Sequence, residues 1–342
     1  MVSRTIGLAE LLFPSRDLSP SALVRALSEP ESGPPAENLI SNEDSYVRAA
    51  GDLARRDLDR GVYLGVGPDQ NFSLIAASRP SLALIVDYRR RNLRLHLLHK
   101  ALMALSANRE EYLSRLMSRR VKLEHEPSSG ADLAKAFGRV SIDRERLRAL
   151  QESVVPVIRP LAILNDDDWQ DLATIHAKLA GPGMSARFLG LPGYPTFGAM
   201  ISETDRKGQP SHFLSSEDRY RVVRELELGD RVLPVVGDFA GKVAMPRIAK
   251  FVHDHSLALS VVYVSDVEFF LMRAGAFDAY VANLNAFPRS PKSVIVRTST
   301  MPIAHRERVD GDRSTTIVRD LSAFLADAKA GRFRAPDDLF AD

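Results

Sequence analysis

The sequence of 342 residues contains no cysteine. This absence excludes disulfide bonds and thiolate metal sites, and it fits a reducing compartment. Aromatic residues make up only 7% of the chain, with a single tryptophan, and the formal net charge is +2. Such a composition lacks the basic stripe with interleaved aromatic residues that is typical of nucleic-acid-binding surfaces, so we expect no nucleic-acid partner.

Long apolar runs are missing as well. Arg4 and Glu10 interrupt a brief apolar run near the N-terminus, which therefore has the pattern of neither a signal peptide nor a membrane helix. No later stretch reaches about 18 uncharged apolar residues, the usual length of a membrane span. We expect a cytoplasmic protein without a membrane partner.

The remaining composition is that of a globular protein, with 45% apolar and 26% charged residues. The length suffices for one large domain or two ordinary ones. We expect an N-terminal arm and a covering helix over residues 1–60, followed by a sheet-forming domain built from residues 61–106 and 231–330. Residues 107–230 interrupt the alternation of strands and helices, and we expect a mostly helical insertion there that forms a lid or substrate region.

Residues 61–92 carry the clearest pattern in the chain. The apolar residues 61–65 predict a buried strand, and Gly65 and Gly67 bracket a tight turn after it. Pro68 then stands at a position that is favoured in the first turn of a helix. Glycines at such a turn let the backbone approach a ligand, and the helix that follows offers free N–H groups.

A second predicted strand, residues 82–86, ends on Asp87. A carboxylate at this distance from a glycine turn is typical of nucleotide-binding units, in which it accepts hydrogen bonds from ribose hydroxyls. In an ordinary α/β turn the same aspartate would only cap the next helix, and that alternative stays open.

Three further strands are predicted at residues 232–236, 258–264 and 293–296. Right-handed crossovers place all five strands in one mainly parallel sheet with helices on both faces, which is an α/β, Rossmann-like fold. The polar residues at the strand ends then meet at one edge, where ligands of open α/β sheets bind. These residues are Gly65, Gly67, Asp87, Asp238, Ser265 and Thr298.

Several polar clusters allow two interpretations. The polar stretch at residues 40–46 either caps the helix that follows or lies over a bound cofactor. Four arginines within residues 89–94 form either a solvated helix face or a contact to an anionic substrate. The aspartates at 166–168 either cap a helix or bind a ligand. His96 and His99 lie three residues apart on an expected helix, but no third ligand completes the set, so we expect no metal site.

Proline and helical periodicity guide the expectations for other segments. Pro156 and Pro160 predict an irregular or edge segment at residues 154–163. One helix is expected over residues 268–285 and a last helix over residues 317–330.

At these strand ends the sequence resembles the class I S-adenosylmethionine-dependent methyltransferases. VYLGVGPDQ is similar to their first motif, and GDF at residues 237–239 is similar to the motif after their third strand. Ser265-Asp266 falls where their fourth-strand motif lies, which is often catalytic. The phrases GVGPDQNF, VVGDFAG and YVSDVEFFL are more similar still to an uncharacterised bacterial family with a methyltransferase-like fold. That closer resemblance implies the fold and no established activity.

The resemblance implies S-adenosylmethionine as the cofactor and a set of residues that contact it. Asp87 stands where the ribose-binding acidic residue stands, and Asp238 and Phe239 would contact adenine. The implied cofactor-binding residues are Gly65, Gly67, Pro68, Gln70, Asn71, Asp87, Tyr88, Asp238, Phe239 and Ser265. Methyl transfer depends mostly on positioning, and it needs a general base only for a poorly acidic hydroxyl or a protonated amine. Asp266 is the candidate for that role.

Departures from the family pattern keep alternatives open. The strand at 62–64 lacks the usual acidic residue, residues 68–71 replace the third glycine of a dinucleotide fingerprint, and no Asn-Pro-Pro-Tyr stretch occurs. We predict a methyltransferase-like protein whose substrate is a small molecule rather than a macromolecule. The alternatives are a nucleotide- or S-adenosylmethionine-binding module without transfer chemistry and, third, an NAD-dependent oxidoreductase.

Overall fold

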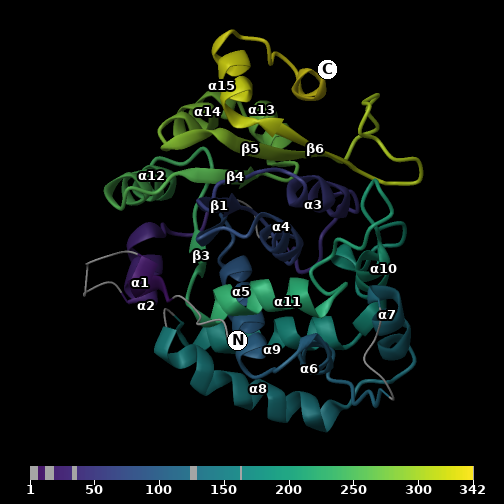
Figure 1. The fold of residues 1–342 in the computed structure, drawn as a ribbon. Coiled ribbons are helices and arrows are strands. Elements are labelled where there is room, and N and C mark those ends of the chain that lie inside the picture. Colours follow the sequence, from purple (N-terminus) through teal and green to yellow (C-terminus); the bar gives the residue numbers. More distant parts are fainter. Residues whose placement is uncertain (1–6, 12–18, 33–36, 124–128, 162–163, 342) are drawn as a thin grey trace.

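We describe the protein from a computed structural model, in residues 7–11, 19–32, 37–123, 129–161 and 164–341. In this part of the chain six strands form a sheet in the order β3-β2-β1-β4-β5-β6 (Figure 1). The strands are β1 (Val62–Gly65), β2 (Leu82–Asp87), β3 (Val232–Val236), β4 (Leu259–Tyr263), β5 (Arg289–Ser299) and β6 (Thr315–Asp320). Neighbouring strands are parallel except β5 and β6, which are antiparallel. The protein is therefore an α/β protein with a mostly parallel mixed sheet.

Helices cover the sheet on both sides. At its β6 end, α3 packs against one side, while α14 and α15 lie on the other (Figure 1). The helices close to the sheet are α2 (Pro20–Leu27), α3 (Tyr46–Ala54), α4 (Gln70–Ser78), α5 (Arg90–Ala104), α11 (Glu217–Leu228), α12 (Ala244–Asp254), α13 (Val267–Arg273), α14 (Phe277–Asn285) and α15 (Leu321–Lys329). Between α5 and α11 the chain forms α6 (Arg109–Leu116), α7 (Gly130–Gly138), α8 (Arg144–Ile158), α9 (Asp166–Ala180) and α10 (Phe197–Ser202). A short helix, α1 (Leu8–Leu11), precedes α2.

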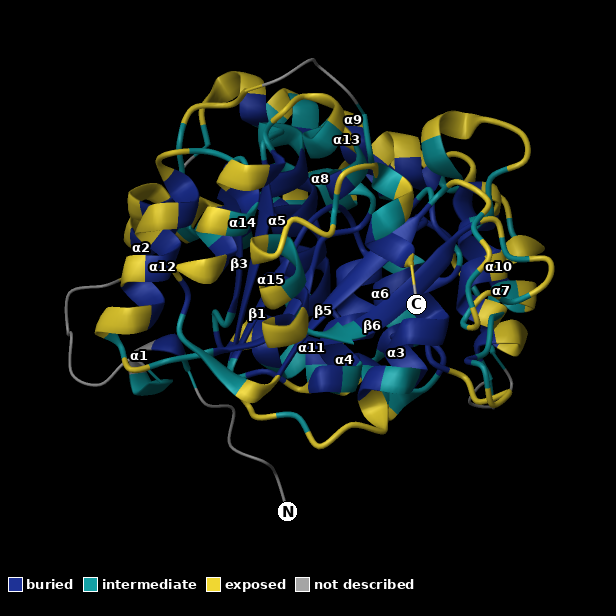
Figure 2. Cartoon of the chain, turned by 90° about the horizontal axis from the view of Figure 1, so that it is seen from above, coloured by how far each residue is buried: buried dark blue, intermediate teal, exposed yellow. Residues whose placement is uncertain are grey.

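The core lies along the central strands. β1, β2, β3 and β4 are buried along their whole length, and Figure 2 shows the sheet in dark blue beneath a more exposed surface. Because helices cover both faces of a parallel sheet, its strands are continuous apolar runs, which is why the sequence locates them well. No helix in the described residues has the length and apolar character to cross a bilayer.

The expectation of an irregular segment at residues 154–163 is wrong for its first part. Residues 154–158 form the end of α8, and Pro156 lies inside that helix. A proline within a helix costs about 3 kcal/mol because it removes a hydrogen bond and crowds the preceding turn. Val154 and Ile158 are fully buried on either side of it, and each such side chain contributes about 1.5–3 kcal/mol. Tertiary packing therefore offsets the proline.

Two expected helices also differ from the structure. The first residues of the expected helix 317–330 belong to β6, which pairs with β5, and α15 begins only after Asp320. The Asp320 carboxylate caps α15 by accepting a hydrogen bond from the Ala323 amide at 2.8 Å. The expected helix 268–285 is divided into α13 and α14 around Gly275, whose φ of +67° suits glycine and ends the first helix.

The arginines at the start of α5 form ion pairs within the protein. Arg90 and Arg94 both contact the buried carboxylate of Asp168, at 2.6 Å each, and Arg91 contacts Asp171 at 2.7 Å. Both aspartates belong to α9. Asp168 also completes a capping box with Asn165, so the capping interpretation is confirmed for Asp168. These three arginines fasten α5 to α9 and are neither a solvated face nor a contact to substrate.

Candidate functional site

The strand ends that the sequence singles out lie along the carboxyl edge of the sheet. β2, β1 and β4 are adjacent and parallel, so Asp87, the glycine turn and Ser265 follow neighbouring strands at this edge. Asp238 follows β3, and Thr298 lies near the end of β5. The sheet order reverses between β1 and β4, and a crevice at such a point is where open α/β sheets bind ligands.

The glycine turn after β1 is held rigid by its own side chains. Asn71 Nδ2 donates to the carbonyl oxygens of Val66, Gly67 and Pro68 at 2.8–3.1 Å, and Asn71 Oδ1 accepts from Tyr63. Asn71, expected to contact the cofactor, therefore has its hydrogen-bonding groups occupied by the turn.

The two glycines of this turn serve different purposes. A Cβ at Gly65 would lie only 2.5 Å from the Tyr63 ring, so glycine at this position allows internal packing. Gly67 has a φ of +84°, a conformation that other residues rarely adopt, and it gives the turn its shape. Gly67 is thus the glycine that brings backbone to the carboxyl edge.

Asp87 is buried at the end of β2 and is engaged by a neighbour. Its carboxylate accepts hydrogen bonds from the Arg89 backbone amide at 3.0 Å and from Arg89 Nε at 2.8 Å. Burial raises the pKa of Asp87, and the adjacent Arg89 guanidinium opposes that rise. The same guanidinium lies 4.7 Å from the centre of the Tyr88 ring. Arg89 thus occupies the carboxylate that the sequence assigns to ribose.

The end of β3 is covered by an N-terminal residue that sequence reasoning missed. Glu29 accepts hydrogen bonds from the backbone amides of Asp238, at 2.8 Å, and Ala244, at 3.0 Å. Phe239 is buried, and its ring centre lies 6.3 Å from that of Tyr280. Phe239 is therefore a core residue, and stacking on adenine is not the role its position favours.

Glu43 lies at the centre of a buried polar cluster at the ends of β4 and β5. Its carboxylate accepts hydrogen bonds from the hydroxyls of Tyr263 and Thr298, each at 2.8 Å, and from that of Ser265. Burial, together with the nearby charge of Asp266, raises the pKa of Glu43 to about 7. Glu43 belongs to the polar stretch 40–46, which was expected either to cap a helix or to cover a cofactor; that stretch was the only signal for it.

Asp266 faces Glu43 across the Ser265 hydroxyl, and its own partners are distant. Asn42 Nδ2, Ser265 Oγ and Thr300 Oγ1 approach the Asp266 carboxylate only to 3.4–3.5 Å. Burial raises the pKa of Asp266 as well. Within the described part of the chain, no lysine or arginine forms an ion pair with Glu43 or Asp266.

Two residues of the glycine turn, Asp69 and Gln70, add oxygen acceptors to this region. Asp69 is buried, and burial raises its pKa to about 7. Gln70 Nε2 donates to the Tyr263 hydroxyl at 3.3 Å, while Gln70 Oε1 is buried and has no hydrogen-bond partner. The Tyr46 hydroxyl lies close enough to both Asp69 and Glu43 for their charges to raise its pKa. The region at the carboxyl ends of β1 and β4 is therefore rich in acceptors.

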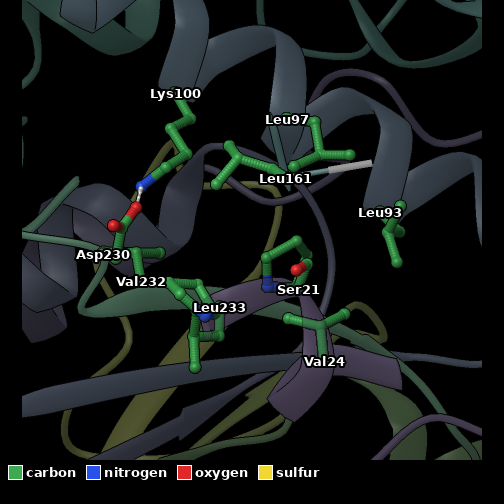
Figure 3. Close-up of a pocket in the computed structure, with 11 residues that line it drawn as sticks. Ser21, Val24, Leu93, Leu97, Lys100, Leu161, Asp230, Val232 and Leu233 are labelled. Carbon is green, nitrogen blue, oxygen red and sulfur yellow. Dashed lines mark ion pairs between the residues drawn. The ribbon is translucent and has the colours of Figure 1, made fainter. Parts of the chain in front are cut away.

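Two hollows lie near the sheet. One opens beside Asp266 at the carboxyl edge. The other lies between α2, α5 and β3, where Lys100 forms an ion pair with Asp230 at 2.9 Å (Figure 3). Asp230 precedes β3 whereas Asp238 follows it, so the second hollow is at the opposite end of that strand.

The two histidines of α5 are core residues. His96 Nε2 lies 2.9 Å from the Gly67 carbonyl oxygen, and His99 Nδ1 lies 2.8 Å from the Tyr112 hydroxyl. Burial lowers the pKa of His96 to about 4. The described residues include no group of three acidic, histidine or cysteine side chains placed to hold a metal ion.

Comparison with models of protein families finds a match over most of the chain. A family model described as "Domain of unknown function (DUF7790)" matches residues 39–154 and 197–337. A search of curated proteins finds no match. The matched residues include all six strands, the glycine turn and the Glu43 cluster.

Proposed function

The chain belongs to the DUF7790 family, and we propose that it is a methyltransferase-like protein that binds S-adenosylmethionine at the carboxyl edge of a Rossmann-like fold. The strand order 3-2-1-4-5-6 supports this proposal, because it is the order of doubly wound nucleotide-binding sheets. The segment between α5 and α11 contributes no residue to the lining of the hollow beside Asp266, so its role as a lid or substrate region stays a prediction.

The observation that carries the proposal is the excess of buried or partly buried acidic groups at the carboxyl ends of β1 and β4. Glu43, Asp69 and Asp266 gather near β1 and β4 with no lysine or arginine paired to them in the described residues. A ligand that carries positive charge and N–H donors would relieve their desolvation. S-adenosylmethionine carries a sulfonium and an ammonium group, whereas the diphosphate of NAD would be repelled. The acidic crevice therefore favours S-adenosylmethionine over the oxidoreductase alternative.

The residues present fit this cofactor at several points. The unpaired Gln70 Oε1 suits a donor such as the ammonium group. Gly67 brings backbone to the crevice, and Asp87 would accept from ribose hydroxyls once it exchanges Arg89 for them. When bound, the cofactor supplies an electrophilic methyl group on sulfur. Asp266, beside the hollow, is the residue placed to hold a proton from an acceptor.

A second candidate function is a binding module that has kept the crevice but not the transfer chemistry. Two contacts favour it: Arg89 engages the Asp87 carboxylate, and Glu29 engages the backbone at the end of β3. Both groups stand where an adenosine moiety would be recognised. A ligand that binds without turnover would separate this function from the first.

Calorimetric titration of the full chain with S-adenosylmethionine, S-adenosylhomocysteine and NADH tests the proposal. We expect micromolar binding of the first two and none of NADH. Asp87→Ala should weaken binding by about 1–3 kcal/mol, the size of a lost hydrogen bond to a charged group. Asp278→Ala, an exposed position on α14, is the matched control and should bind as the parent does. If neither sulfur compound binds, the proposal is wrong.

A further inference from the structure

The hollow beside Asp266 has apolar walls and one acidic corner. It lies where the loop after β4, the end of β5 and the 3-10 helix η4 (Pro336–Phe340) meet. Its apolar lining includes Phe269, Met301, Pro336, Leu339 and Phe340. Asp266, Thr298 and Thr300 line it from the strand ends. A small molecule with an apolar body and one polar end matches this lining.

The acidic corner has more acceptors than donors. The hydroxyls of Tyr263, Ser265 and Thr298 all donate to Glu43, which lies behind the lining. Asp266 is then left with contacts of 3.4–3.5 Å, at the outer limit of a hydrogen bond. Gln70 Nε2 donates to the Tyr263 hydroxyl, and the buried Gln70 Oε1 has no hydrogen-bond partner.

The other carboxylates along this hollow differ from Asp266. Glu268 accepts hydrogen bonds from Arg297 Nε at 2.6 Å and from the Tyr280 hydroxyl at 3.0 Å. Asp337 is exposed to water on η4. Asp266 is thus the partly buried carboxylate of the lining that has neither an ion pair nor a close donor, although Arg89 is near enough to feel its charge.

We propose that this hollow binds a small apolar amine, with the protonated amino group on Asp266 and the apolar body against Phe269 and Phe340. An ammonium group brings three N–H donors, which the corner lacks, and it adds no further acceptor. It also neutralises one of two adjacent carboxylates. A carboxylate or phosphate ligand would add a third negative charge, and an alcohol would bring a single donor.

The role of this amine as a methyl acceptor rests on the proposed function. Asp266 takes a proton from R–NH₃⁺ and becomes a carboxylic acid, which leaves R–NH₂ with a free lone pair. With S-adenosylmethionine bound, that lone pair would form the N–CH₃ bond, and the electron pair of the broken S–CH₃ bond would stay on sulfur. The product R–NH₂–CH₃⁺ is again a cation. Glu43, behind Thr298, does not touch the amine and holds Ser265 and Thr298 in position.

Binding of three probes to the full chain without cofactor tests the amine site. The probes are 2-phenylethylamine, 2-phenylethanol and 3-phenylpropanoate, which share an apolar body and differ in charge. We expect the amine to bind at least about tenfold more tightly than the alcohol and the acid not to bind. Asp266→Asn should remove most of the preference for the amine, whereas the exposed Asp278→Asn should keep it. Equal binding of amine and alcohol, or unchanged amine binding in Asp266→Asn, overturns the proposal.

A second variant decides the question if Asp266→Asn does not fold. Met301 is about half exposed at the rim of the hollow, so Met301→Lys places a tethered ammonium there with little effect on the core. Met301→Lys should weaken the binding of 2-phenylethylamine several-fold, and Met301→Leu should not. Equal affinities for the amine in the two variants would count against the site. Amine binding without S-adenosylmethionine binding would keep the site and end the proposed function. Binding of S-adenosylmethionine without binding of the amine would support the proposed function and contradict the amine site.

Discussion

The carboxylate of Glu43 accepts a hydrogen bond at 2.8 Å from the hydroxyl of Tyr263, at the end of β4. This bond joins the segment before α3 to the centre of the sheet, and the Tyr263 hydroxyl in turn accepts from Gln70 in the glycine turn. One tyrosine therefore links the N-terminal segment, β4 and the start of α4. Changes at Glu43 should affect both stability and the candidate site.

The first prediction concerns the pH dependence of stability. The pKa of Glu43 is about 7 in the folded protein, above its ordinary value of 4.5. A raised pKa means that the folded state holds the proton more tightly, so this contribution to stability is full below about pH 4.5 and is lost as the pH rises through about 7. The loss should be on the order of 2 kcal/mol.

Glu43→Gln removes that titration while keeping the shape of the side chain. Urea unfolding of the parent and of the variant at pH 5 and pH 8 measures the difference. We expect the parent to lose more stability than the variant between the two pH values. Asp69 and Glu227, with pKa values also raised to about 7, remain in both proteins and cancel in the comparison. Equal losses would show that the pKa of Glu43 is not raised, so that the carboxylate is ionised in the folded and the unfolded protein throughout this range.

The second prediction concerns Arg89, which competes for Asp87. Arg89→Ala frees the Asp87 carboxylate and removes a positive charge from the site proposed for a cationic cofactor. We expect S-adenosylmethionine to bind about fivefold more tightly, corresponding to about 1 kcal/mol. Calorimetry of Arg89→Ala beside Arg25→Ala, an exposed arginine on α2, measures this effect. Weaker binding in Arg89→Ala alone would mean that the guanidinium itself holds the ligand.

The third prediction concerns the ion pairs between α5 and α9. Asp168 is fully buried, contacts Arg90 and Arg94, and caps α9. Asp168→Ala leaves both arginines without this partner and should cost about 3–5 kcal/mol of unfolding free energy. Asp167→Ala, an exposed neighbour in the same helical turn, should change stability by less than about 0.5 kcal/mol. The urea midpoints of the two variants decide whether Asp168 stabilises the fold or belongs to a solvated helix face.

Acid should act on the same interaction. The arginines and the cap lower the pKa of Asp168 to about 2, below its ordinary value of 3.8. The stabilisation is therefore present above about pH 3.8 and is lost as the pH falls towards 2. Over that range the parent should lose more stability than Asp168→Ala. An equal loss of stability in the parent and in Asp168→Ala would contradict the role of Asp168 as the ion-pair partner of the two arginines.

The fourth prediction concerns a buried ion pair in the C-terminal part of the sheet. Arg297 Nε donates to Glu268 at 2.6 Å, and its guanidinium carbon lies 4.7 Å from the Phe324 ring centre and 5.3 Å from that of Phe340. Arg297→Met leaves Glu268 buried beside Tyr280 alone and should cost about 3–5 kcal/mol.

The double variant Arg297→Met/Glu268→Gln should recover part of that loss, because it removes the unpaired charge as well. Thermal unfolding of the two single variants and the double variant forms a complete cycle. Additive losses would indicate that the two residues stabilise the protein independently of each other.

Much of the sheet could be predicted from the sequence. β1 to β4 are fully buried parallel strands, which appear in the sequence as short, mostly apolar runs. β6 escaped prediction because its residues run directly into α15 and its pairing with β5 is antiparallel and distant in sequence. The helix across Pro156 escaped because its cost is offset by tertiary contacts that no local pattern reports.

The candidate site divides in the same way. The sequence alone located Gly67, Asp87, Asp238 and Ser265 at strand ends, since parallel strands carry their carboxyl ends to one edge. Only the tertiary structure decided which side chains occupy that edge. Glu29 and Glu43 come from the N-terminal segment, and Arg89 turns back onto Asp87. These contacts depend on how segments distant in sequence fold over the sheet, whereas strand positions depend on local runs of apolar residues.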